Sequence, residues 1–400
     1  MYVYYVIAFF TLLLGYTIFR KKWGISSYLL TIYLFSLLVS LLIMEIVPFF
    51  QESKDGSIVF CSALAIFFFP FMKTAPEIKS DTNPLKVHKL ISVCKITSYV
   101  LIFLSIVIIP VIISAMHTDF NELREGSFSY SGNFITSIGL RYLGTFAHLS
   151  YAMMVVFFYL FTFFDGYKKE KCLFFIASMS APYNGMLYGG RTQMIYWLLA
   201  VGFNLILFHK YLSAKKKKVL YMFLLIIVSI VFVYIVAATI SRFADSKAGV
   251  NGSLLSYIGQ PYINFCNFYE NYPTVQNISL CRIFPFTNYL LNGPFDLQKY
   301  RVDIFTRSGM DIGIFYTMLG DFLVDIGVKG IYVYAIVYAF LSYLITRKKS
   351  LYIYDLLILS LLFMIPLQGV FYYSYWQMPV TFCAILVLVF SRYLKKQKHE

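Results

Sequence analysis

Long apolar runs recur from one end of this chain to the other, and they constrain its fold more than any other feature. The runs are roughly sixteen to twenty-five residues long, and a helix needs about 20 apolar residues to cross a bilayer. Only helices and closed barrels satisfy every backbone hydrogen bond there, and barrel strands would appear as short alternating segments. With 60% hydrophobic and 13% charged residues, the sequence predicts an all-α polytopic membrane protein.

The basic clusters predict how the spans are oriented, because such clusters mark the cytoplasmic side of a membrane protein. With about eleven spans, every cluster falls on that side, the N-terminus lies outside and the C-terminus lies inside. The clusters are 20–22, 73–95, 168–171, 210–218, 347–349 and 392–398. The predicted spans are 2–19, 27–48, 57–72, 93–116, 143–163, 172–188, 192–208, 219–240, 328–346, 351–369 and 376–392.

The chain is predicted to have three parts. Residues 1–240 form the first eight transmembrane helices, and residues 328–400 form the last three with a basic cytoplasmic tail. Residues 241–327 form an outer loop far longer than an ordinary connection. This loop is too rich in Tyr and Phe to be a disordered tail, so we expect a folded cap.

A short apolar segment at the end of this loop, residues 313–326, carries Asp321 and Asp325. A charge at mid-bilayer costs about 2.5–3.5 kcal/mol on insertion scales, so a full span here is disfavoured. We predict instead a short helix at the outer interface or a re-entrant piece buried against protein.

The net charge of +15 does not indicate nucleic-acid binding, because basic clusters beside spans explain it. The sequence has no Cys/His spacing that suits zinc, no phosphate-binding G-x-x-x-x-G-K-[ST] loop and no G-x-S-x-G element. We therefore expect no metal and no cofactor, and the lipid bilayer is the first predicted partner.

The arginines are distributed differently from the lysines. Twenty of the 24 lysines fall on the predicted inner side, whereas seven of the ten arginines fall on the outer side. A guanidinium group is suited to forked hydrogen bonds with phosphate oxygens. This pattern predicts an outward-facing site for a phosphorylated, lipid-linked substrate. The outer arginines are Arg124, Arg141, Arg191, Arg242, Arg282, Arg301 and Arg307.

Gly189, Gly190 and Arg191 open a predicted span on the outer side. Glycines allow close approach of the backbone to a ligand, and a helix N-terminus offers free N–H groups to an anion. A diphosphate site is one interpretation. A tight turn between two helices, with an interfacial arginine, is the other.

Two further pairs could carry chemistry. Arg141 and His148 are seven residues apart, which places them on one face of a helix as a phosphate ligand and a polar contact or base, although His148 could equally be a hydrogen-bonded interior histidine. Asp321 and Asp325 are four apart and face one way. One of them could act as general base toward a sugar hydroxyl, or both could orient arginines of the cap. The candidate arginines are Arg301 and Arg307, with Arg242 and Arg282.

Three segments together resemble the Wzy-type O-antigen and capsule repeat-unit polymerases: Gly-Gly-Arg at 189–191, Gln-Pro-Tyr-Ile-Asn-Phe at 260–265, and the stretch 315–330. The resemblance is best over 181–346. It implies a glycosyltransferase of the bacterial inner membrane that joins polyprenyl-diphosphate-linked oligosaccharide repeat units at the outer face, without metal or nucleotide. The resemblance implies that the family's outer-loop arginine corresponds first to Arg191, and as a second choice to Arg301 or Arg307.

The resemblance also implies partners of the same pathway, namely a chain-length regulator and a flippase. Two alternatives stay open from the sequence. One is a flippase or transporter for the same lipid-linked sugar, which would typically be built from repeats that are not visible here. The other is an O-antigen ligase, which shares the architecture and differs in its acceptor.

Overall fold

The computed structural model describes residues 2–20, 24–44, 53–72, 76–81, 83–116, 134–186, 190–243, 249–271, 282–293, 297–309 and 314–396. Within these ranges the chain is almost entirely helical, with one pair of two-residue parallel strands. Nine of the described helices are long and apolar enough to cross a membrane. The predicted all-α, multi-pass architecture is therefore confirmed, whereas the number of spans and their orientation stay predictions.

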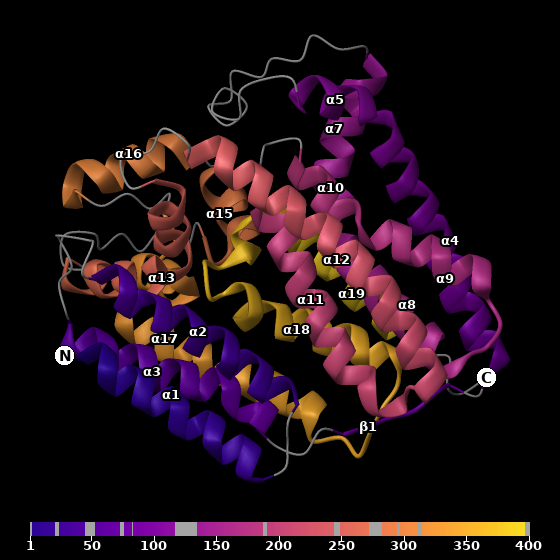
Figure 1. Cartoon of the computed structure of the whole chain (residues 1–400), viewed down its shortest axis with the longest axis horizontal. Coiled ribbons are helices and arrows are strands. Elements are labelled where there is room, and N and C mark those ends of the chain that lie inside the picture. The colour runs from indigo at the N-terminus through magenta and orange to yellow at the C-terminus, as the bar shows by residue number, and fades with distance from the viewer. Residues whose placement is uncertain are drawn as a thin grey trace. The chain divides into compact units, whose positions relative to one another are not determined.

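The elements can be followed along the chain in Figure 1. The first half contains α1 (Tyr2–Phe19), α2 (Ile25–Met44), α3 (Lys54–Phe68), η1 (Phe69–Met72), β1 (Glu77–Ile78), α4 (Pro84–Val107), α5 (Ile109–Met116), α7 (Phe134–Phe146), η2 (Ala147–Leu149), α8 (Ser150–Phe163), α9 (Lys168–Ser178) and α10 (Ser180–Met186). The second half contains α11 (Thr192–Phe208), η3 (His209–Tyr211), α12 (Ala214–Phe243), α13 (Gly249–Glu270), α15 (Pro285–Asn292), α16 (Leu297–Ser308), α17 (Thr317–Thr346), β2 (Ser350–Leu351), α18 (Ile353–Gln368), η4 (Ser374–Trp376) and α19 (Met378–Lys396).

Within the described residues every predicted span overlaps helical residues, and two of the spans fall outside the nine long helices. The span predicted at 172–188 is interrupted at Met179, so it consists of α9 and the short α10. The span predicted at 351–369 corresponds to α18, which is apolar but only 16 residues long. These two segments account for the difference between the eleven predicted spans and the nine long apolar helices of the described residues.

The chain divides into two compact units, each assembled from separate stretches of sequence. Unit 1 contains Met1–Pro76, Asn251–Lys349 and Leu361–Thr381, and unit 2 contains Glu77–Val250, Ser350–Ser360 and Phe382–Glu400. Most of the predicted cap, residues 241–327, thus belongs to the same unit as the first three helices. Its location on the outer side of a membrane stays a prediction.

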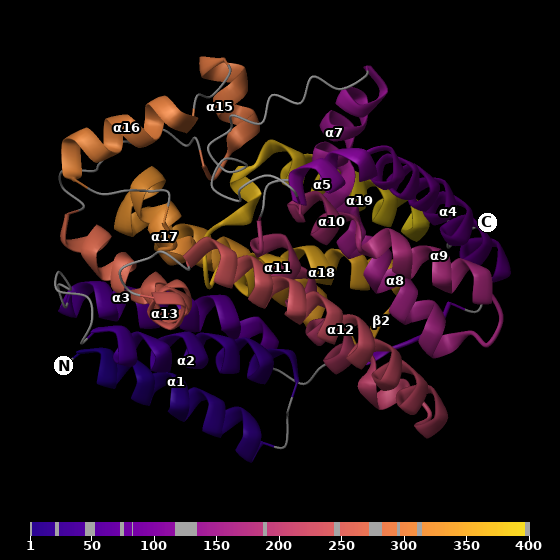
Figure 2. The same ribbon diagram turned by 45° about the horizontal axis from the view of Figure 1, so that its top comes forward.

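In unit 1, helices α1, α2 and α3 lie side by side in both views, and α17 packs on α3 (Figures 1 and 2). An aromatic core fills the space between the first three helices, with Phe10 stacked on Tyr33 and Phe68 edge-on to both. Large buried aromatic side chains dominate the packing energy of such a core. Helix α3 begins where the Ser53 hydroxyl accepts a hydrogen bond from the N–H of Gly56.

Helix α13 packs directly against α2 and α3 in unit 1. The hydroxyls of Ser36 and Ser40 donate to the carbonyls of Ile258 and Gly259, at 2.7 and 2.6 Å. A side chain at Gly259 would come within 2.8 Å of the Ser40 backbone, so only glycine permits this approach. The first part of the predicted cap is therefore a helix packed against the apolar helices of unit 1, which the loop-like composition of 241–271 did not indicate.

In unit 2, α8 packs against α9 and α11, and α4 packs against α7 and α9. Asn83 caps α4, and Pro84 occupies its first turn, where the missing N–H costs nothing. The two strands pair in parallel, with Glu77 beside Ser350.

Several distant segments of unit 2 meet at one end, which we call the lysine end: β1, β2, η3, the end of α8, and the starts of α4, α9 and α12. The N–H groups of Ile78 and Asp81 donate to the hydroxyls of Tyr211 and Tyr159, both at 2.7 Å. Lys216 of α12 donates to the carbonyl of Thr162 in α8 at 3.0 Å. Basic clusters that are far apart in the sequence are thereby brought to the same end of this unit.

The opposite end of unit 2, which we call the arginine end, consists of α7, η2, α10 and the start of α11. Helix α10 packs against α7, η2 and α11. Arg141, His148 and Arg191 belong to these elements. Helix α11 separates Arg191 from η3 by 17 residues, or about 25 Å at 1.5 Å per residue.

Candidate functional site

The first part of α17 is a short buried helix that carries both predicted aspartates. Gly327 interrupts α17 with φ 69° and ψ −180°, a conformation open to glycine and unfavourable for other residues. Thr317, at the other end, also has a positive φ of 65°. This short helix is thus separated from the span predicted at 328–346, as expected from the sequence. Residues in sparsely populated backbone conformations cluster at functional sites.

The start of the short helix is anchored by the turn that follows α18. The N–H groups of Tyr316 and Thr317 donate to the carbonyl of Phe371, and the N–H of Met318 donates to that of Gly369. These bonds satisfy donors that the first turn of a helix leaves unpaired. Because every side chain from 317 to 325 is buried, the segment is held rigidly from all sides.

Asp321 lies at the centre of a polar cluster in unit 1. Its Oδ1 is 2.8 Å from Nη1 of Arg282 and accepts a hydrogen bond from the Tyr316 hydroxyl at 2.9 Å. Its Oδ2 accepts the backbone N–H of Tyr373 at 2.7 Å. The carboxylate is fully buried, so these partners replace the water that it loses on folding.

Asp325 accepts hydrogen bonds from the backbone of the segment that contains Arg282, the residue that pairs with Asp321. Its Oδ2 accepts the N–H groups of Arg282 and Ile283, at 2.6 and 2.9 Å, and its Oδ1 accepts the Tyr300 hydroxyl at 3.3 Å. Those two N–H groups lie just before α15. The Arg282 guanidinium also lies 5.4 Å from the centre of the Tyr316 ring, a cation–π distance.

This geometry favours one of the two roles considered for the aspartates. Both carboxylates are fully buried and accept several donors each, an arrangement that suits a positioning role. Together they orient Arg282 and fix the chain before α15. The general-base role of Asp321 or Asp325 stays a prediction, and it would require a rearrangement of this cluster.

Sequence reasoning missed the tyrosines that complete the cluster. Tyr300 and Tyr316 supply hydroxyl donors, and Tyr373 supplies a backbone donor. The chain contains 35 tyrosines, and membrane interfaces explain most of them. The signal available was the position of Tyr316 beside the start of the Asp-bearing helix, which composition alone does not separate from the rest.

The other predicted arginines of unit 1 are less enclosed. Arg301 is half-buried on α16. Arg307 is exposed and pairs with Asp303, one helical turn away, through Nη2 at 2.9 Å. Arg124 and Gly189 lie outside the described residues, as does the side chain of Arg242.

Arg191 lies at the start of α11 in unit 2 and is almost completely buried, with 6% of its surface exposed. Its Nη1 donates to the Thr239 hydroxyl at 2.6 Å. The N–H of Gly190 donates to the carbonyl of Gly185, so the residue before Arg191 is hydrogen-bonded back to α10. Residues 187–189 lie outside the described residues, and both the tight turn and a diphosphate ligand for Arg191 stay predictions.

Arg141 and His148 also belong to unit 2. Arg141 is exposed on α7, and His148 is half-buried in η2, where its ring stacks on Tyr151 at 6.4 Å. The 3-10 turn Ala147–Leu149 interrupts the α-helical register between them. The predicted common face of Arg141 and His148 stays a prediction, because only the last residues of the seven-residue spacing lie in this turn and a 3-10 turn rotates each residue by only about 20° more than an α-helix.

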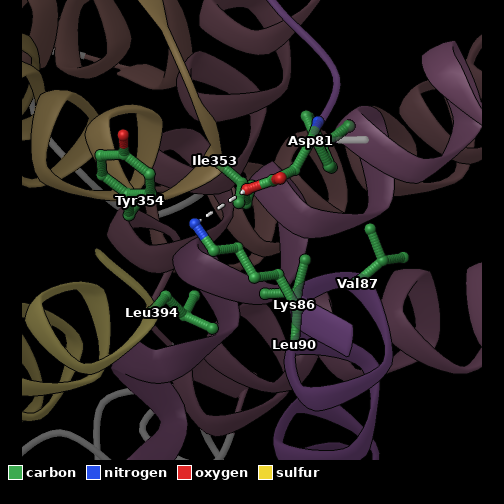
Figure 3. Close-up of a pocket in the computed structure, with 8 residues that line it drawn as sticks. Asp81, Lys86, Val87, Leu90, Ile353, Tyr354 and Leu394 are labelled. Carbon is green, nitrogen blue, oxygen red and sulfur yellow. Dashed lines mark hydrogen bonds and ion pairs between the residues drawn. The ribbon is translucent and has the colours of Figure 1, made fainter. Parts of the chain in front are cut away.

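Unit 2 also has a small pocket at its lysine end (Figure 3). Lys86 points toward Asp81 across 3.7 Å, and both side chains are about nine-tenths buried. The pair neutralises itself within an apolar lining, which suits a structural joint between the starts of α4 and α18 better than a substrate site. The apolar lining residues are Val87, Leu90, Ile353 and Leu394.

Within the described part of the chain, no group of three or more His, Cys, Asp or Glu side chains is placed to hold a metal ion. Comparison with known proteins yields no match among family models, curated proteins or solved structures. The predicted outward-facing site for a phosphorylated, lipid-linked substrate stays a prediction.

Proposed function

We propose that this chain is a membrane-embedded glycosyltransferase that polymerises polyprenyl-diphosphate-linked oligosaccharide repeat units at the outer face of the bacterial cytoplasmic membrane. The observation that carries the proposal is the separation of charges in unit 2. Lysines gather at one end, and Arg141 and Arg191 belong to the other. If the lysine end faces the cytoplasm, these arginines face the compartment where a flipped lipid-linked sugar is presented.

The contacts at the lysine end support the orientation on which this proposal depends, with about eleven spans, the N-terminus outside and the C-terminus inside. Strand pairing joins Glu77–Ile78 to Ser350–Leu351, and the pocket brings Lys86 beside Leu394. Segments from the clusters 73–95, 168–171 and 210–218, and from the regions beside 347–349 and 392–398, therefore share one end of unit 2. A wrong span count would scatter such clusters over both ends.

The chemistry follows from the substrate class. The non-reducing-end hydroxyl of one lipid-linked unit attacks the anomeric carbon of the growing chain. A new glycosidic C–O bond forms, the C–O bond to the diphosphate breaks, the hydroxyl proton passes to a base, and polyprenyl diphosphate departs. Negative charge develops on the departing phosphate, and preorganised guanidinium groups would stabilise it in the transition state. The diphosphate ester supplies the driving force, so no metal or nucleotide enters the step.

The residues divide between two tasks under this proposal. Arg191, with Gly190 beside it, would bind the diphosphate through its forked guanidinium. Asp321 and Asp325 would hold Arg282 and the chain before α15 in a fixed position. The short helix between Thr317 and Gly327 would act as the rigid support for that part of unit 1.

Glycan length in a deletion strain tests the proposal. A polymerase deletion is expected to leave single repeat units still exported and to remove long chains. Loss of all exported glycan would instead support a flippase. Normal long chains that are no longer attached to their final lipid acceptor would support a ligase. Either of the last two outcomes would overturn the proposal.

A further inference from the structure

The lysine end of unit 2 carries more positive charge than its own acidic residues can balance. Four of the acidic residues there are already engaged in ion pairs with lysines. A paired carboxylate is not available to neutralise further lysines. The pairs are Lys79–Glu77 at 3.8 Å, Lys86–Asp81 at 3.7 Å, Lys95–Glu170 at 3.1 Å and Lys216–Asp165 at 2.9 Å.

Six further lysines, on α9, η3 and α12, form a group that we call the lysine patch. Among the residues that the structure describes, none of the six is in an ion pair with a carboxylate. Five are exposed and the sixth, Lys217, is half-buried. The lysine patch consists of Lys168, Lys169, Lys210, Lys215, Lys217 and Lys218.

Contacts between helices gather the lysine patch around the end of α8. Lys216 reaches from α12 to Asp165 and to the Thr162 carbonyl, which ties the start of α12 to the end of α8. The Tyr211 ring of η3 lies 5.7 Å from that of Phe163. Lys217 contacts Nε2 of His209 at 3.2 Å, and Nδ1 of the same ring bonds to the Tyr221 hydroxyl. The lysine patch is therefore carried by elements that contact one another, rather than by an isolated loop.

The lysine patch lies where apolar helices end. Helix α11 leads into η3 at Phe208, and α12 begins at Ala214. Directly after the lysines of α12, Val219 and Met222 are more than half exposed, at 54% and 58%. Cationic side chains followed at once by exposed apolar ones match the step from phosphate headgroups to acyl chains in a bilayer.

We propose that the lysine patch binds anionic phospholipid headgroups of the membrane leaflet next to the end of α8. The ligand chemistry is a phosphate diester presented at a lipid surface, and lysines recognise it as mobile point charges rather than by a fork. Exposed apolar residues of α12 contact the acyl chains of the same lipids. This binding would fix the depth of α8, α11 and α12 in the leaflet, and it does not depend on the reaction that the protein catalyses.

The test compares three versions of the purified full-length protein in detergent micelles, with native mass spectrometry counting bound lipid. Phosphatidylglycerol and phosphatidylcholine of equal acyl length compete at equal concentration. The versions are the unaltered chain, the fourfold variant Lys210→Gln, Lys215→Gln, Lys217→Gln and Lys218→Gln, and the matched fourfold change of these lysines to Arg. Exposure of most of these positions predicts that all three fold alike, which circular dichroism checks.

The unaltered chain and the Arg version are expected to prefer phosphatidylglycerol, and the Gln version is expected to lose at least about tenfold of that preference, since each surface lysine contributes roughly 1 kcal/mol toward an anionic membrane. Raising the salt concentration should reduce the preference of the first two versions. Equal preference in the Gln version and the unaltered chain would overturn the proposal. So would full competition by millimolar inorganic phosphate, because it would assign the patch to a soluble anion.

Discussion

The charged cluster of unit 1 and the lysine patch of unit 2 contain charges of two different kinds. Arg282, Asp321 and Asp325 are buried, and their partners are other groups of the same cluster. The lysine patch is largely exposed, and the acidic residues nearest to it are already paired. Buried charges need internal partners and therefore fix the architecture, whereas exposed surplus charges can bind something outside the protein.

Replacing Asp321 by alanine should have the largest effect on stability. The change removes one partner of a buried ion pair and leaves the Arg282 guanidinium without it, which costs about 3–5 kcal/mol. Asp303→Ala is the matched control, because it breaks the exposed pair with Arg307 and should cost less than about 1 kcal/mol. Thermal unfolding of the purified variants measures both. Equal stability of the two variants would remove the distinction between buried and exposed charges.

Arg191→Lys tests whether this buried arginine of unit 2 has a function beyond its structural contacts. Lysine keeps the positive charge but lacks the forked donor geometry of the guanidinium group, so a charged hydrogen bond worth about 1.5–3 kcal/mol should be lost. Polymer formation should therefore fall roughly tenfold to a hundredfold. Arg347→Lys, at an exposed position on the predicted inner side, should leave the chain-length distribution unchanged. The readout is glycan length in a complemented deletion strain. Wild-type chain length with Arg191→Lys would exclude Arg191 from the site.

Gly327→Ala tests the break that sets the short helix of the cluster apart from the rest of α17. A Cβ at φ 69° and ψ −180° should cost about 1–3 kcal/mol. Gly15→Ala is the control, because Gly15 is in a helix with no other atom within 4 Å of an added Cβ, and should be neutral or stabilising by about 0.5–1 kcal/mol. Unfolding temperatures in the same detergent compare them. Equal unfolding temperatures for the Gly327→Ala and Gly15→Ala variants would contradict the proposed strain at Gly327.

Asp325→Asn separates positioning from general-base catalysis. The amide oxygen can accept the N–H groups that Oδ2 accepts, and the amide nitrogen can donate to the Tyr300 hydroxyl, so the loss of stability should be about 1–2 kcal/mol. Polymer should still form, because no proton transfer depends on this group. Complete loss of polymer in a variant as stable as the unaltered protein would instead make Asp325 the base.

The smallest effect is expected at the lysine end, from Asp165→Asn. The hydrogen bond from Lys216 lowers the pKa of the exposed Asp165 carboxyl below its usual 3.8. Its contribution to stability is therefore present above pH 3.8 and is lost as the pH falls through the lowered value. Unfolding at neutral pH should differ little between the variant and the unaltered protein, and any difference should vanish in acid. A large difference at neutral pH would mean that this pair is structural like the buried cluster.

The sequence predicted the regular features of the fold well. Apolar runs located the helices, because the length needed to cross a bilayer is a strong and local signal. The charges of Asp321 and Asp325 correctly separated their short helix from the span at 328–346, since two carboxylates are costly in lipid. The gathering of basic segments at one end of unit 2 also agrees with the prediction that they share a side.

Other features depend on contacts between distant residues and could not be predicted. Nothing in the sequence indicates that Arg282, among seven outer arginines, is the one that Asp321 holds. Helix α13 was not indicated by its Gly- and Asn-rich composition, because tertiary contacts such as that between Gly259 and Ser40 are not visible in the sequence.

The central claim is that the lysine end and the arginine end of unit 2 face opposite sides of the membrane, and cysteine labelling tests it most directly. Arg141→Cys and Lys210→Cys, both at exposed positions, are introduced separately into a chain whose six native cysteines have been replaced. A membrane-impermeant maleimide on intact cells should label position 141 and should reach position 210 only after permeabilisation. Labelling of both positions from the same side would contradict the account.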